Sequence, residues 1–66
     1  MKATVNGALR ELPDGLTLAD LLAEVGAPPS GIAVALNSSV VRRALYETQV
    51  IEDGDAIEII KAVAGG

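Results

Sequence analysis

One segment of this sequence has the apolar spacing of an α-helix, and stretches typical of β-strands lie on both sides of it. Its apolar stripe recurs at helical intervals and consists of Leu18, Leu21, Leu22 and Val25. Thr17 is placed to cap the first turn, with Asp20 three residues later as in a capping box. Gly26 and then Pro28 prevent continuation. A short helix with one apolar face must cover another apolar layer, which here is one face of a sheet.

The flanking strand patterns form two pairs. Asn6-Gly7 is a strong signal for a type I′ hairpin turn and predicts a hairpin over residues 1–12. Alternation and turn residues then predict a third strand, a short returning strand, one helical turn around Leu45 and a last strand, over residues 32–36, 40–42, 43–48 and 56–62. The predicted fold class is therefore α+β, with two hairpins flanking one helix.

The composition excludes most catalytic chemistry. The chain has 66 residues, no cysteine and no histidine, and its one aromatic residue is Tyr46. It therefore lacks the usual nucleophilic thiol, the commonest general base and the commonest metal ligand. No glycine pattern of the phosphate-binding type occurs. We expect a protein that is not an enzyme, binds no cofactor, and undergoes chemistry carried out by a partner.

The charge balance bears on partners. The formal net charge is −4, and an acidic chain with scattered cations is a poor ligand for nucleic acid. A basic protein partner is compatible with this charge, although solubility alone also explains it. No apolar run has the length of a membrane span, and no apolar segment typical of a secretory signal follows Lys2. We expect no membrane partner and a cytoplasmic location.

Two charged clusters have a functional and a structural interpretation. Glu52, Asp53 and Asp55 flank Gly54, but they lack the ligand spacing of a calcium loop, so a solvated turn is the preferred interpretation. The Arg42-Arg43 pair is the one cationic pair, and it suits either contact with a partner or a solvated strand end.

The last strand predicts a docking surface. Ile57 and Ile59 share one face, which we expect to meet the helix. Glu58, Ile60 and Ala62 share the other face and are the predicted contacts with a partner. An isolated exposed isoleucine is the structural alternative.

The sequence finishes with Ala62-Val63-Ala64-Gly65-Gly66. Two glycines add little stability, because glycine loses the most backbone entropy on ordering. They are either a frayed end or a slim segment that lets a terminal carboxylate enter a narrow site. The residues alone leave both open.

Taken together, these motifs resemble one known family. The Asn6-Gly7 hairpin, the capped LTLADLL helix, VALN followed by VV-R, GD-x-IEII and the final AVAGG are similar to the ThiS family of sulfur carriers in thiazole biosynthesis. The resemblance covers the whole chain. It implies the ubiquitin-like β-grasp fold, a mixed four- to five-stranded sheet packed on one main helix, with a domain over residues 1–62 and a flexible tail over 63–66. Ala3 and Val5 are smaller than the residues often found at these positions in the family.

The resemblance also implies a mechanism. An E1-like, ThiF-like enzyme uses ATP to adenylate the C-terminal glycine, here Gly66, and the product is converted to a thiocarboxylate. A ThiG-like thiazole synthase then takes the sulfur. Val63, Ala64 and Gly65 are expected to lie in the partner's active site, and the chain alone is expected to be a monomer.

Three alternatives share parts of this pattern. The small subunit of molybdopterin synthase has the same fold and Gly-Gly end, and a carrier for another sulfur pathway, such as tRNA thiolation, would look similar. The third is a β-grasp interaction module whose tail has no chemical role. An autonomous hydrolase or nuclease is disfavoured by the missing histidine, cysteine and metal cluster.

Overall fold

A computed structural model describes residues 1–28 and 30–61. Its elements are β1 (Lys2–Val5), β2 (Ala8–Glu11), α1 (Leu18–Glu24), β3 (Ile32–Leu36), β4 (Ser39–Val41), the 3₁₀ turn η1 (Arg43–Leu45) and β5 (Ala56–Lys61). The predicted order is confirmed. β4 begins one residue earlier than predicted and leaves out Arg42, and β5 ends at Lys61 within the described residues, so its predicted last residue, Ala62, lies outside them.

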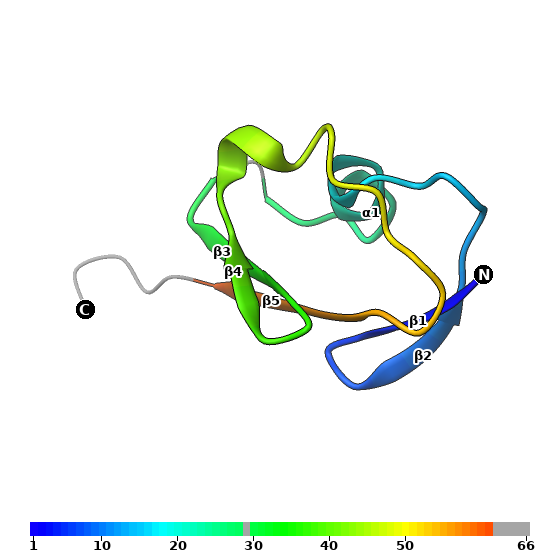
Figure 1. The fold of residues 1–66 in the computed structure, drawn as a ribbon. Coiled ribbons are helices and arrows are strands. Elements are labelled where there is room, and N and C mark those ends of the chain that lie inside the picture. Colours follow the sequence, from blue (N-terminus) through cyan, green and yellow to red (C-terminus); the bar gives the residue numbers. More distant parts are fainter. Residues whose placement is uncertain (29, 62–66) are drawn as a thin grey trace.

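The strands form one five-stranded sheet in the order β2-β1-β5-β3-β4. β1 pairs with β5 in parallel, and the other neighbours pair antiparallel, so the predicted mixed sheet is confirmed. Figure 1 shows α1 and η1 on one side of this sheet, and no described helix covers the other side. The uncovered side is hereafter the open face.

Local hydrogen bonds define both ends of α1. The Thr17 hydroxyl accepts from the Asp20 N–H, and the Asp20 carboxylate accepts from the Thr17 N–H, which is the predicted capping box. At the other end Gly26 has φ +71°, and the Gly26 and Ala27 N–H groups donate to the carbonyls of Ala23 and Leu22. This is a Schellman motif, so the predicted stop at Gly26 is confirmed.

The core lies between α1 and the sheet. Its buried side chains are Ala3, Val5, Leu12, Leu18, Leu21, Val34, Ile51 and Ile57. The predicted helix stripe faces this core, with Leu18 and Leu21 fully buried. Ile51 enters the core from a segment without regular structure, because its N–H donates to the Leu16 carbonyl beside the Thr17–Val50 bridge. The sequence pattern did not single out Ile51.

Candidate functional site

The strand register determines which residues share the open face. Ile57 is buried on the α1 side, so alternation places Glu58 and Ile60 of β5 on the open face, as predicted. Across β3, Ala35 lies opposite Glu58 and Ala33 opposite Ile60, and Val40 of β4 lies opposite Ala35. Small alanines therefore separate the larger side chains of β5 and β4.

This part of the sheet exposes an apolar patch. Ile60 is 55% exposed and Val40 is 75% exposed, and between them lie Ala33, which is partly exposed, and Ala35, which is buried. We call these four residues the open-face patch. Sequence analysis identified Ile60 but missed Val40, because the pairing of Val40 with Ala35 is set by the tight turn at Asn37 and Ser38, both with positive φ.

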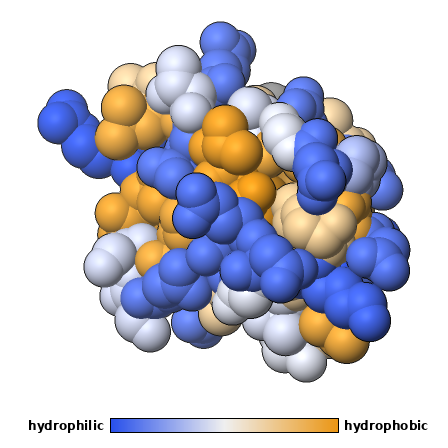
Figure 2. Space-filling view, turned by 45° about the vertical axis from the view of Figure 1, so that its right-hand side comes forward, coloured by the Kyte–Doolittle hydropathy of each residue, from blue (hydrophilic) through white to orange (hydrophobic). Residues whose placement is uncertain are grey.

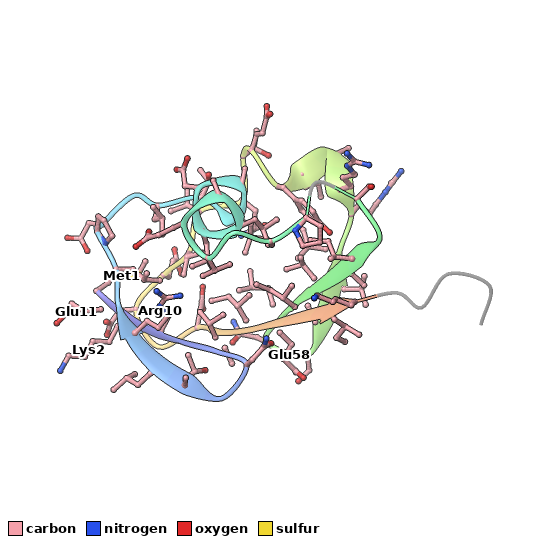
Figure 3. All side chains as sticks on the ribbon, turned by 180° about the vertical axis from the view of Figure 1, so that it is seen from behind. Met1, Lys2, Arg10, Glu11 and Glu58 are labelled. Atoms are coloured by element: carbon pink, nitrogen blue, oxygen red, sulfur yellow. The ribbon has the colours of Figure 1, made fainter. Side chains whose placement is uncertain are left out.

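Glu58 lies beside the open-face patch. It is exposed and lines a shallow hollow of about 470 Å³ with residues of the β1–β2 turn, including Asn6 and Gly7. Figure 3 shows Glu58 on β5, remote from the charged group of Met1, Lys2 and Glu11 at the far end of the sheet. A partner that covers the patch would therefore meet one carboxylate at its edge.

Two asparagine side chains hold β5 in place. The Asn6 amide oxygen accepts from the Ile59 N–H at 2.8 Å. The Asn37 amide oxygen accepts from the Ala56 N–H at 2.9 Å, and its amide nitrogen donates to Asp55 at 2.9 Å. Both asparagines have left-handed backbones, which this residue type tolerates better than most. Together they fix the strand that precedes residues 62–66.

The acidic turn has a structural role. The Asp53 carboxylate accepts from the Lys2 N–H at 2.7 Å, and the Asp55 carboxylate accepts from the Glu52 N–H at 2.8 Å. Within residues 1–28 and 30–61, no group of three or more acidic side chains is arranged to hold a metal ion. The preferred interpretation as a turn is confirmed for this part of the chain.

The two arginines of the cationic pair separate. Arg42 follows β4 in an extended conformation, so alternation places it on the same side as Val40. Arg43 instead lines a groove on the helix side with Leu22 and Tyr46. One arginine therefore lies near the open-face patch and the other does not.

The structure does not describe the remaining predicted site residues, which are Ala62, Val63, Ala64, Gly65 and Gly66.

Figure 2 shows the molecule turned by 45° from the view of Figure 1. On the face seen there, hydrophobic residues form separate patches divided by hydrophilic ones. Over the described ranges, no helix is both long and apolar enough to cross a membrane.

Comparison with known proteins gives a consistent result. Residues 3–66 match the ThiS family. The sulfur carrier protein ThiS of Escherichia coli (strain K12) is 29% identical over 66 residues, with both chains covered completely. The crystal structure of the thiamine biosynthesis protein ThiS from Geobacter metallireducens superposes with a TM-score of 0.87 at 29% identity, again over both whole chains. The β-grasp fold implied by the resemblance is thereby confirmed.

Larger proteins match as well. The thiazole synthase of Paramagnetospirillum magneticum (strain ATCC 700264 / AMB-1) is 33% identical over 66 residues. The chain spans about a fifth of the length of the thiazole synthases that it matches. The family match covers residues 3–66, and the carrier of the same length is covered completely. The chain belongs to the ThiS family of sulfur carrier proteins in thiamine biosynthesis.

Proposed function

We propose that this chain carries sulfur as a thiocarboxylate on Gly66. The observation that carries the proposal is the family match, which runs through residue 66 and so includes both glycines. We propose a domain over residues 1–62 and a tail over residues 63–66 that enters the partner enzymes. Extended at about 3.4 Å per residue, residues 62–66 reach about 17 Å beyond β5.

The proposed chemistry begins with a poor electrophile. The Gly66 carboxylate attacks the α-phosphate of ATP on an E1-like, ThiF-like enzyme, which forms an acyl adenylate and releases pyrophosphate. A sulfur nucleophile supplied through that enzyme attacks the acyl carbon, and AMP leaves. The nucleotide is bound by the partner and not by this chain, which accordingly needs no cofactor of its own. Because activation consumes ATP, the proposed place of action is the cytoplasm.

The second proposed partner is a ThiG-like thiazole synthase that accepts the sulfur. The full-length match of this chain to a fifth of two thiazole synthases supports it, since a carrier segment within the same protein is a covalent form of that association. We propose that the carrier alone is a monomer and binds neither nucleic acid nor membrane.

Docking is proposed on the open face next to the tail. Ile60 supplies the exposed apolar contact and Glu58 a carboxylate at its edge, and Ala62 is proposed as a further contact. An exposed apolar patch with a charged rim is the usual composition of a protein interface. The location directly before residues 63–66 means that one partner can hold the sheet and the tail together.

The Gly66→Ala variant and a variant lacking Gly65 and Gly66 test this function. Because neither change touches the core residues, both variants should unfold at the same urea concentration as the parent protein. Purified activating enzyme should adenylate the Gly66→Ala chain at a much reduced rate and the shortened chain not at all, as measured by ATP–pyrophosphate exchange. Normal exchange with either variant would contradict the proposal, and unchanged function of the shortened chain would favour a plain interaction module.

A further inference from the structure

In the described part of the chain, one end of β5 is paired with a strand on one side and not on the other. β1 pairs with β5 at Thr4–Ala56 and Val5–Ile57, and the chain then turns away at Asn6 and Gly7. β3 continues alongside β5 as far as Lys61. Figure 1 shows β5 extending past the end of the β1–β2 hairpin. Within residues 1–28 and 30–61, the second half of β5 therefore has an open edge on its β1 side.

The backbone groups at this edge can be assigned. On the β3 side, the Ala56 carbonyl accepts from the Asn37 N–H, and the Ala56 N–H donates to the Asn37 side chain. Backbone groups point to alternate sides along a strand, so the N–H and C=O groups of Ile57, Ile59 and Lys61 point toward β1. The Asn6 N–H donates to the Ile57 carbonyl, and the Asn6 side-chain oxygen accepts from the Ile59 N–H. Among the described residues, the Ile59 carbonyl and the Lys61 N–H have no such partner on this side.

These two groups match one residue of an added strand. In a parallel ladder, a residue opposite Ile60 donates its N–H to the Ile59 carbonyl and accepts from the Lys61 N–H. Thr4 and Asn6 already donate to the Asp55 and Ile57 carbonyls in this way, so the added residue would continue the β1 ladder by one step. Extended peptides commonly bind proteins by completing an exposed sheet edge.

A groove lies beside this edge on the α1 side. It has a volume of about 390 Å³, and its lining includes the apolar side chains of Val25, Ile32 and Ile59. It also includes Arg10 and Lys61, two of the five Lys and Arg residues in a chain of net charge −4. Figure 3 shows Arg10 reaching from β2 toward the α1 side. Neither cation forms an ion pair within the described part of the chain.

We propose that an extended segment of the enzyme that receives residues 62–66 adds to β5 at this edge and places an acidic side chain between Arg10 and Lys61. The backbone edge fits an extended peptide, and the two cations favour a carboxylate on it. This surface is distinct from the open-face patch, because Arg10 pairs with the buried Ala3 and so lies on the other side of the sheet. The inference rests on the proposed function, since the occupant belongs to a partner enzyme.

Charge reversal with a matched control tests the groove. Arg10→Glu and Lys2→Glu change the net charge equally, but Lys2 comes directly before the buried Ala3 on β1, so it lies on the opposite side of the sheet from the groove. Arg10→Glu should weaken binding to the activating enzyme or to the thiazole synthase about fivefold to tenfold, whereas Lys2→Glu should change it less than about twofold. Urea unfolding confirms that each variant is folded, and Lys61→Glu replaces Arg10→Glu if the latter is not.

Amide hydrogen exchange tests the strand. In the same complex, the Lys61 N–H should exchange at least about tenfold more slowly than in the free chain, while the Leu9 N–H on the β2 edge should not change. Two results would overturn the inference. One is equal affinity of Arg10→Glu and Lys2→Glu for both the activating enzyme and the thiazole synthase. The other is a Lys61 N–H that exchanges in both complexes as fast as in the free chain. If the parent chain binds neither enzyme, the proposed function itself fails. If it binds but these effects are missing, the inference alone fails.

Discussion

Asn37 illustrates how single residues attach the hairpins to β5. Its φ of +50° is unfavourable for most side chains, and its amide both accepts from the Ala56 N–H and donates to Asp55. Asn6 has the same combination of a left-handed backbone and an amide bond to β5. The dipeptide Asn6-Gly7 could be interpreted as a turn from sequence, but the side-chain bond to Ile59 could not, because it joins residues 53 positions apart.

Replacing Asn37 should destabilise the fold. Asn37→Ala loses the bond to the Ala56 N–H and strains the backbone, for a total of about 2 kcal/mol. Asn37→Gly loses the same bond but relieves the strain, so it should cost about 1 kcal/mol. Urea denaturation measures both values. Equal stability of the alanine variant and the parent protein would show that the turn does not depend on this side chain.

Replacing Ile60 should impair docking without affecting the fold. Ile60 is 55% exposed on the open-face patch, so Ile60→Asp removes apolar contact and adds charge where a partner is proposed to bind. The KM for the carrier in adenylation should rise at least about fivefold, with kcat much less affected. Leu9→Asp is the matched control, since Leu9 is 67% exposed but lies on β2, away from the patch. Identical kinetics for the two variants would argue against the patch.

At the scale of the element, α1 depends on its ends. It has seven residues, far fewer than an isolated helix needs in water, so its caps and its buried face must supply the stability. Both caps could be predicted, since Thr17, Asp20 and Gly26 are local signals. The role of Ile51 could not, because that residue is buried by long-range bonds from a segment without periodicity.

The capping box gives a prediction for this element. Thr17→Ala removes the hydroxyl that accepts from the Asp20 N–H and should cost about 1 kcal/mol. In a domain of this size, that loss lowers the melting temperature by about 4–8 °C. Thr17→Ser keeps the hydroxyl and should melt close to the parent protein. A melting temperature for Thr17→Ala within about 1 °C of that of Thr17→Ser would mean that tertiary contacts alone set the start of the helix.

At the scale of the whole molecule, the sequence predicted more of the fold than of the site. Alternation in each strand placed Ile57 in the core and Ile60 on the open face. The groove beside Arg10 and the patch around Val40 depend on register and on where β1 turns away from β5, which a single sequence does not specify. The predicted site residues beyond Lys61 lie outside the described part of the chain, so their role rests on the family.

The central claim is that Gly66 carries sulfur, and an intact-mass spectrum tests it most directly. The protein would be isolated from its native cells while they synthesise thiamine, and its C-terminal peptide would be fragmented. We predict a fraction heavier by one exchange of oxygen for sulfur, with the change located at Gly66. An unmodified terminus in those cells would contradict the carrier function proposed for this chain.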